Sequence, residues 1–521
     1  MNSRLFIKDN LDLILILTLY SLLAVISLKY FNIIGCDEIA YINIAHGYAI
    51  GDFSDAINGY WSPLYSWLLT PFFISGFTPL YGVYASKTLA LIIGFFTIIS
   101  LKLLSNVLNM SKISQRSMLF SLMFVILFFA LMFSTPDLLV VFLIVTYLSV
   151  IFKSDYVDKL IYGVLCGFIG ALAYLSKSYA FPFFLAHFIL FNIIYYFKDV
   201  NSLKKKNILK NLILGLSVFF IISGVWTGLI SEKYDKITIS TSGEYNHALV
   251  GPSYPIHPAF YQGLYKPPNN ISNSIWDDLS YVKMNQWSPF ESWNSFNRQI
   301  TILENNAIFA IKIIESFFLI AVILVIATII FIWKSKSNKI TKEKLIYLLI
   351  TMIIYTFGYC FIAVEWRYLW LISVLLMISG FFIIDNIAKN KEITLNLRNI
   401  LLILLICGII IQPLQSIIQL SNEDNSFFDL SEKLKDGYNI TGSIASNKWG
   451  NTLIISYYMN TKYYGGTKEN ESLYDLKNEL ENNNIDYYFV WDSVPISDLS
   501  NYKEITNSKI KGLMIYKRIK N

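Results

Sequence analysis

Charged residues are scarce in this chain of 521 residues: Asp, Glu, Lys and Arg make up 15% of it, whereas 55% is hydrophobic. A soluble domain cannot bury that much apolar surface, so the composition predicts a polytopic membrane protein. The net charge of +6 comes from basic residues in short loops between apolar runs. This distribution is typical of membrane topology and argues against nucleic acid as a partner.

Cysteine is also scarce. The four cysteines, Cys36, Cys166, Cys360 and Cys407, are scattered and show neither a disulfide framework nor the spacing of a metal site. Nucleotide-binding motifs are absent, as are convincing internal repeats, and the missing repeats argue against a secondary transporter. The first apolar run has no small-residue cleavage site after it, so we expect Leu11 to Tyr30 to be a retained helix.

Long apolar runs are plentiful, and each is near the ~20 residues that span a bilayer core. They predict about eleven transmembrane helices, near residues 11–30, 81–104, 117–134, 136–153, 158–175, 179–198, 208–231, 306–333, 344–363, 366–386 and 398–420.

The loops between these runs alternate in charge, which predicts the orientation. With a cytoplasmic N-terminus, every inside loop carries Lys or Arg, as in the cluster Lys204 to Lys206. An odd number of spans then places the C-terminus outside. We therefore expect a multi-pass protein of the cell (plasma or inner) membrane, with residues 1–420 as its transmembrane module.

Three extracytoplasmic segments follow from this topology. Residues 31–80 form the first, rich in Trp, Tyr and Phe, where we expect short amphipathic helices at the membrane interface. Residues 232–305 form a long loop without clear periodicity, and such loops often act as lids. Residues 421–521 form a small soluble α/β domain. In it, 427–434 and 473–480 have helical periodicity, while 485–491 and 512–517 are typical of strands.

Ionisable residues at span ends gather on the outer side. An unpaired charge close to hydrocarbon is costly, so these residues should face one another or a polar cavity. A carboxylate can deprotonate an attacking hydroxyl, and cations can hold a phosphate. The cluster therefore suits transfer from a lipid phosphate to a hydroxyl; its members are Asp37, Glu38, Asp137, Lys177, Glu365 and Arg367.

Five motifs around these residues resemble the GT-C membrane glycosyltransferases. They are DEIAY from Asp37, WSPLYSWLL from Trp61, the PD pair at Asp137, AYLSKSYAFPFF around Lys177, and EWRYLW from Glu365. The match is to the branch that contains protein O-mannosyltransferases and the aminoarabinose lipid A transferase. It covers most of the chain, including the soluble tail.

This resemblance implies a GT-C fold, a polyprenyl-phosphate sugar donor and an extracytoplasmic acceptor. It implies that Asp37 is the base for the acceptor, with Glu38 as its neighbouring acid, and that Tyr41 lies near the donor phosphate. Asp137 matches a second acid that shapes the site or, with Asp37, binds a divalent cation such as Mg, Mn or Zn.

The same resemblance implies that Lys177 contacts the phosphate and that Arg367 can reach it, with Glu365 and Trp61 as further substrate-binding candidates. The chain departs from the lipid A transferase where Trp61, Ser62 and Pro63 replace a Glu-Lys-Pro motif, so the acceptor stays open.

Each of these residues also has a structural interpretation. Asp37 and Asp137 could cap helices, Lys177 could extend to the headgroups, Glu365 could pair with Arg367, and Trp61 could be an interfacial anchor. Three histidines in polar loops, possible ligands or bases, are more typical of surface residues: His46, His247 and His257.

The sequence therefore predicts an inverting, polyprenyl-phosphate-dependent glycosyltransferase, a hexosyl- or pentosyltransferase, with a protein, glycan or lipid acceptor. The alternative is a transporter or flippase of lipid-linked sugars. Because the middles of the spans are almost uncharged and the charges gather at one face, the enzyme is favoured.

Overall fold

The chain forms two compact units in the computed structural model, which describes residues 3–28, 34–254, 263–318, 320–335, 337, 339–421, 426–468, 471–492, 499, 501–507 and 509–519. The first unit comprises Met1–Phe31, Lys87–Thr227 and Ser288–Asn422. The second comprises Asn32–Ser86, Gly228–Trp287 and Glu423–Asn521. Each unit is therefore assembled from three separate stretches of the sequence.

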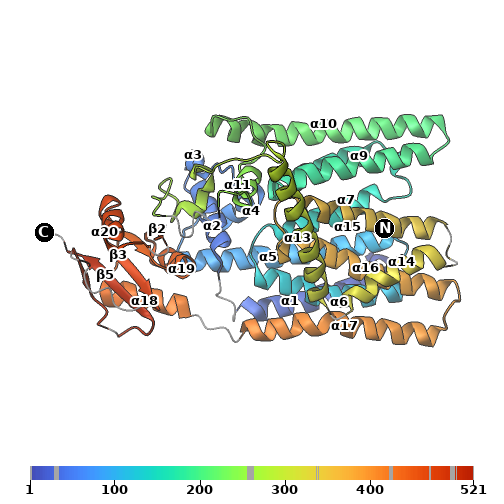
Figure 1. The fold of residues 1–521 in the computed structure, drawn as a ribbon. Helices are drawn as coiled ribbons and strands as arrows, with labels where there is room; N and C mark the ends of the chain where they lie inside the picture. The colour runs from blue at the N-terminus through green and yellow to red at the C-terminus, as the bar shows by residue number, and fades with distance from the viewer. Residues whose placement is uncertain are drawn as a thin grey trace. The chain divides into compact units, whose positions relative to one another are not determined.

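The first unit is a helical bundle, in which α15, α16 and α17 run side by side (Figure 1). The residue boundaries between the two units fall within α5 and α10. The helices are α1 (Ser3–Leu28), α5 (Pro79–Val107), α6 (Lys112–Met132), α7 (Asp137–Ile151), η2 (Tyr156–Asp158), α8 (Ile161–Ser176), α9 (Ala180–Lys198), α10 (Ser202–Lys233), α13 (Trp293–Phe317), α14 (Ala321–Lys334), α15 (Lys339–Cys360), η4 (Trp366–Leu369), α16 (Trp370–Lys389) and α17 (Leu395–Ser421).

Each apolar run of the sequence contains a helix of this bundle, which confirms the predicted helical class. Among the described residues, eight helices are long and apolar enough to cross a membrane. Two apolar helices, α7 and α8, are shorter, with 15 and 16 residues. The run at 306–333 contains parts of two helices, α13 and α14, which are together long and apolar enough for one span but are bent where they meet.

Small residues allow close helix packing inside this bundle. A Cβ atom at Gly167 of α8 would lie 2.1 Å from the carbonyl oxygen of Gly215 in α10. One turn earlier, a Cβ at Gly163 would lie 2.5 Å from the carbonyl oxygen of Asn211. Apolar lipid gives helices no hydrophobic reason to associate, so such close backbone contacts stabilise membrane bundles.

The second unit contains short helices from residues 31–80 and 232–305: α2 (Cys36–Ala49), α3 (Phe53–Ala56), α4 (Pro63–Leu69), η1 (Thr70–Phe73), α11 (Ser242–Leu249) and η3 (Ile275–Tyr281). The first-loop helices are short, as predicted. However, α2 is not amphipathic, because its buried residues lie all around its circumference.

The tail of the second unit carries a five-stranded sheet in the order β2-β1-β3-β5-β4. The strands β2, β1 and β3 are parallel, β5 is antiparallel to β3, and β4 is an edge strand antiparallel to β5. Its elements are α18 (Ser426–Tyr438), β1 (Ser443–Ser446), α19 (Trp449–Met459), β2 (Lys462–Gly466), α20 (Leu473–Asn482), β3 (Tyr487–Trp491), β4 (Tyr502–Glu504) and β5 (Leu513–Arg518).

This sheet confirms both predicted strands and both predicted helices of the tail. β3 is buried along its whole length at the centre of the sheet, which explains its aromatic and β-branched sequence. Tyr488 and Val490 of β3 pack with Leu476 and Leu480 of α20 in the core of this domain. Three strands were missed: β1 and β4 have only four and three residues, and β2 ends in two glycines.

Candidate functional site

A buried ionic cluster joins three separate segments of the first unit. Asp137 is the first residue of α7, Lys177 lies between α8 and α9, and Arg367 lies in η4. Lys177 Nζ lies 2.5 Å from Asp137 Oδ1, and Arg367 Nε lies 3.9 Å from Asp137 Oδ2. Thr135 Oγ1 also donates to Asp137 Oδ2 at 2.7 Å. The structure thus brings together three residues that the sequence placed at the same side of the bundle.

Lys177 does not extend toward headgroups, since its side chain is only 21% exposed and reaches Asp137. Its Nζ lies 3.7 Å from the centre of the Tyr368 ring, and Tyr359 stacks on Tyr368 at 4.8 Å. An ammonium group over a desolvated aromatic face is stabilised by the ring quadrupole. Burial lowers the pKa of Lys177, and the Asp137 carboxylate opposes this effect.

Arg367 has a second acidic partner. Its Nε donates to Glu365 Oε2 at 2.8 Å, and the Glu365 side chain is 49% exposed. The pairing of these two residues, which the sequence left as an alternative, is therefore present. The guanidinium also lies over the ring of Phe133, at 5.5 Å, and a guanidinium offers five N–H donors. This surrounding fixes the position of Arg367 on η4.

The surroundings of Asp137 do not fit a divalent cation. One carboxylate oxygen faces Lys177, and the other faces Arg367 and Thr135. Within the part of the chain that the structure describes, no group of three or more His, Cys, Asp or Glu side chains could hold a metal ion. The metal role of Asp137 with Asp37 stays a sequence-based expectation, and we derive no chemical step from it.

Asp37 lies in the first turn of α2 in the second unit. Its Oδ1 accepts a hydrogen bond from Nε1 of Trp276, at 3.1 Å. Trp276 belongs to η3 of the second loop, so this contact joins two loops that are far apart in the sequence. Glu38 is buried and turned toward Gly35, where an added Cβ would lie 2.4 Å from Glu38 Oε2. The two adjacent acids therefore point to different surroundings.

Tyr41 and Trp61 are both buried in the second unit, where Trp61 contacts Trp276. Their rings meet edge to face at 5.2 Å. Trp61 Nε1 donates to the backbone carbonyl of Trp276 at 3.0 Å. Trp61 thus packs against Trp276, the residue that donates a hydrogen bond to Asp37.

Two of the three histidines considered as ligands or bases lie in the second unit and are packed against aromatic rings. His46 stacks on Phe77 at 4.2 Å, and burial lowers the pKa of His46. His247 stacks on Trp287 at 4.6 Å. His257 lies outside the described residues. These contacts fit the structural interpretation of the described histidines better than a ligand role.

Several buried polar residues in both units were not singled out by the sequence analysis. Asp277 and Asn43 are buried in the second unit and hydrogen-bonded to each other. In the first unit, Lys87 is buried and donates to the carbonyl of Leu131 at the end of α6, at 3.1 Å. The position of Lys87 inside an apolar run could have indicated a buried polar contact, because an unpaired lysine is costly there.

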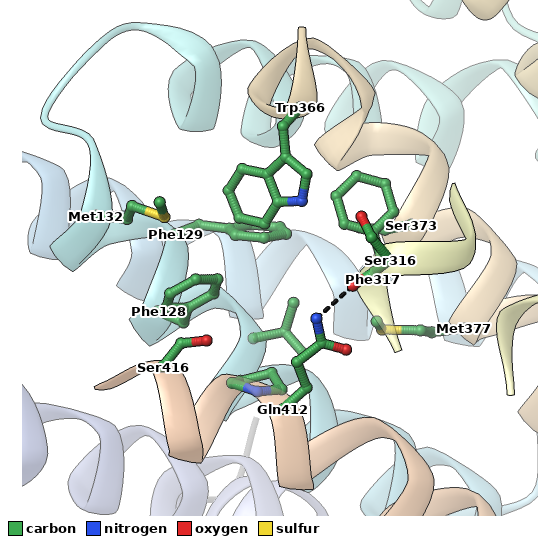
Figure 2. A pocket seen from close by; sticks show the side chains of 12 residues that line it. Phe128, Phe129, Met132, Ser316, Phe317, Trp366, Ser373, Met377, Gln412 and Ser416 are labelled. Carbon is green, nitrogen blue, oxygen red and sulfur yellow. Dashed lines mark hydrogen bonds between the residues drawn. The ribbon is translucent and has the colours of Figure 1, made fainter. Parts of the chain in front are cut away.

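A cavity of about 220 Å³ lies in the first unit beside η4. Figure 2 shows aromatic side chains on one side and the polar side chain of Gln412 on another, hydrogen-bonded to Ser316. Trp366 lines the cavity and is followed directly by Arg367 of the ionic cluster. The cavity is otherwise mostly apolar; lining residues include Phe128, Phe129, Met132, Phe317, Met377 and Ser416.

The structure combines a bundle of long apolar helices with a small five-stranded α/β tail, which is the architecture that the sequence predicted. The chain is similar to ArnT from Cupriavidus metallidurans bound to undecaprenyl phosphate, with 10% identity, a TM-score of 0.58 and 98% of each chain covered. It is also similar to the apo oligosaccharyltransferase of Archaeoglobus fulgidus, with 12% identity and a TM-score of 0.51. That match covers 93% of this chain and 70% of the other.

No protein-family model matches the sequence, and no curated protein matches it. The identities to the solved structures are low, so these comparisons define the fold of a multi-pass membrane protein.

Proposed function

We propose that this protein is an inverting glycosyltransferase that moves a sugar from a polyprenyl-phosphate donor to an acceptor hydroxyl outside the cytoplasm. The observation that carries the proposal is the buried cluster of Lys177, Arg367 and Asp137 on a GT-C fold. The similar ArnT structure contains undecaprenyl phosphate, which is the class of lipid carrier that we infer for this chain.

In the proposed reaction, Asp37 acts as general base. Its carboxylate takes the proton of the acceptor hydroxyl, and the oxygen attacks the anomeric carbon from the face opposite the phosphate. The bond between that carbon and the phosphate oxygen breaks, and the polyprenyl phosphate leaves with the electron pair. Glu38 follows Asp37 on α2 and is buried, and we assign it the role of a supporting acid. For Tyr41, the proposed contact with the donor phosphate rests on the resemblance of the DEIAY motif.

The leaving phosphate is stabilised by Lys177 and Arg367. Charged donors are most effective where negative charge develops and water is excluded, and both side chains are largely buried. Asp137 holds the two cations at fixed positions. Glu365 is the exposed partner of Arg367, so a phosphate can compete for that guanidinium without leaving a buried acid unpaired.

The cavity beside η4 suits the lipid part of the same donor. Its aromatic and sulfur-containing lining favours an apolar chain, and Trp366 borders it directly before Arg367. We therefore propose that the first isoprenoid units of the carrier enter this cavity while the phosphate binds Arg367 and Lys177.

The positive-inside distribution of Lys and Arg supports an orientation with the N-terminus in the cytoplasm. Under this orientation, the ends of the spans that carry Asp137, Lys177 and Arg367 face outward, as do α2 and the tail domain. Lipid-linked donors suit that side of the membrane, where nucleotide sugars are absent.

The decisive experiment compares Asp37→Asn with the wild type in purified, reconstituted protein. A panel of polyprenyl-phosphate sugars is supplied with membrane extract as the source of acceptor, and release of polyprenyl phosphate is measured. We expect Asp37→Asn to abolish release while thermal unfolding is unchanged. The matched control is Asp55→Asn, a partly exposed acid of α3 in the same loop. Full activity of Asp37→Asn would overturn the proposed base.

A flippase of lipid-linked sugars is the second candidate. Its supporting observation is a polar group inside the bundle, where His187 contacts Tyr147 at 2.8 Å and Thr351 at 2.9 Å. Both partners are neutral hydroxyls, so this contact fits helix packing equally well. Movement of labelled lipid across vesicles without any sugar transfer would favour this candidate over the enzyme.

A further inference from the structure

A buried polar network around Asp277 ties the second loop to the first inside the second unit. Asn43 Nδ2 of α2 donates to Asp277 Oδ2 at 3.0 Å and to Asn273 Oδ1 at 2.7 Å. Asn58 Nδ2 of the first loop donates to the backbone carbonyl of Asp277 at 2.7 Å. The backbone N–H of Asn273 also donates to Asp277 Oδ2. Two asparagines of the first loop are thus fixed by one residue of the second.

The neighbour of Asp277 is the residue that contacts the proposed base. Trp276 donates to Asp37 Oδ1 at 3.1 Å, and its backbone carbonyl accepts from Trp61 at 3.0 Å. Its ring packs edge to face against Trp449 of α19, at 4.8 Å. Because Trp276 and Asp277 belong to the same short helix η3, the hydrogen bonds of Asp277 fix where the Trp276 indole lies.

The carboxyl group of Asp277 is buried, and only one of its two oxygens accepts hydrogen bonds among the described residues. It is 2% exposed, and its Oδ1 is buried without a hydrogen-bond partner among the described residues. The ionisable groups around it are Cys36 of α2, Tyr457 of α19 and Lys462 of β2. Burial raises the pKa of Asp277 to about 6, and the hydrogen bond from Asn43 and the charge of Lys462 oppose the shift.

We propose that Asp277 is a positioning residue that holds Trp276 against Asp37 by binding η3 to α2, and that proton uptake by its carboxyl group strengthens this attachment. Any consequence of this attachment for catalysis rests on the proposed role of Asp37. The attachment of the second loop to α2 and its dependence on proton uptake are independent of any reaction.

The direction of the pH effect follows from the raised pKa of the Asp277 carboxyl group. A raised carboxyl pKa means that the attached form binds the proton more tightly than a detached, solvated form. The attachment is therefore strongest below the solvated pKa near 4 and weakens as the pH rises to about 6. Above that value the contribution of the bound proton to the attachment is lost.

Hydrogen exchange tests the attachment without an activity assay. At one fixed pH, Asp277→Ala should speed amide exchange in 36–46 and 273–281 by about threefold or more. Asp277→Asn keeps an acceptor oxygen for Asn43 but has no acidic proton. The ratio of the wild-type exchange rate to the exchange rate of Asp277→Asn should therefore increase between pH 5 and pH 7.5. Unchanged exchange in Asp277→Ala, or a constant wild-type ratio, would overturn the proposal.

Kinetics then test the link to Asp37. Asp277→Ala should lower kcat about tenfold with little change in the donor KM, and Asp277→Asn should restore kcat. Asp278 is the matched control, since it is equally buried in η3 but bonded to Tyr234 at 2.6 Å. Asp278→Ala should lower thermal stability like Asp277→Ala and leave kcat within about twofold.

A double-variant cycle with Trp276→Phe separates positioning from general destabilisation. If Asp277 acts through the indole, Asp277→Ala should add little to the kcat loss of Trp276→Phe. Additive losses would contradict this route. Activity retained by Asp37→Asn would refute the proposed base, and the exchange experiment would still decide whether Asp277 attaches η3 to α2.

Discussion

Lys177 and Asp137, 40 residues apart in the sequence, form a buried ion pair in the first unit, with Nζ 2.5 Å from Oδ1. Removing one member of a buried pair leaves the other charge uncompensated and typically costs about 3–5 kcal/mol. We expect Asp137→Ala and Lys177→Met each to lower the thermal unfolding midpoint in detergent. The double variant should recover much of the loss. Single variants as stable as the wild type would contradict a buried pair.

Filling the cavity beside η4 should weaken donor binding. Ser416 lines the cavity, so Ser416→Phe would occupy the space that we assign to the lipid chain. We expect the donor KM to rise about tenfold, which corresponds to about 1.4 kcal/mol. Ile418→Phe on the same helix is the control, because Ile418 is exposed. An unchanged KM in Ser416→Phe would place the lipid chain elsewhere.

The close contact of α8 and α10 gives a stability prediction. Gly167→Leu must push α8 away from the Gly215 carbonyl, since even a Cβ would lie 2.1 Å from it. We expect a loss of about 1–3 kcal/mol, seen as a lower unfolding midpoint. Gly224→Leu in α10 is the control, since a Cβ there meets nothing within 4 Å. Equal effects of the two substitutions would argue against this packing.

The membrane orientation can be tested by cysteine labelling. In a chain whose four native cysteines are replaced, Lys206→Cys should react only with reagent on the cytoplasmic side. Lys435→Cys, in α18 of the tail, should react only from outside. The two positions are exposed, so access to the side chain does not limit labelling. Labelling of both from the same side would contradict the positive-inside assignment.

The tail domain should become less stable as the pH rises through neutrality. Burial and the neighbouring Glu479 raise the pKa of Glu471 to about 7. The folded domain therefore binds this proton more tightly than the unfolded chain, and stability falls as the pH rises from about 4.5 to 7. Glu471→Gln should raise the unfolding midpoint above pH 7 and change little below pH 4. An identical pH dependence in wild type and variant would refute this.

Local sequence patterns predicted much of the fold. The strand β3 was visible in Tyr487 to Trp491 because a central strand buried on both faces needs a run of aromatic and β-branched residues. The spans were visible because the bilayer imposes both length and composition. By contrast, the bend after Phe317 interrupts one continuous apolar run, and composition alone does not distinguish a bent span from a straight one.

The sequence predicted several residues of the candidate site but only part of the contacts between them. Asp137, Lys177 and Arg367 were found because charges at span ends are rare and costly. Trp276 and Asp277 were not singled out, because their neighbours in sequence are ordinary loop residues. Their importance comes from Asn43 and Asp37, more than 230 residues earlier in the chain.

The sequence by itself determined the class of this protein: a helical membrane chain with acids and cations gathered at one set of span ends, and a small α/β tail. Composition and periodicity are sufficient for that, since the bilayer and the sheet each select residues locally. Only the tertiary structure decided which of these residues touch. Lys177 and Arg367 both contact Asp137, and Trp276 donates a hydrogen bond to Asp37. Such contacts depend on how distant segments pack, and no local pattern encodes that choice.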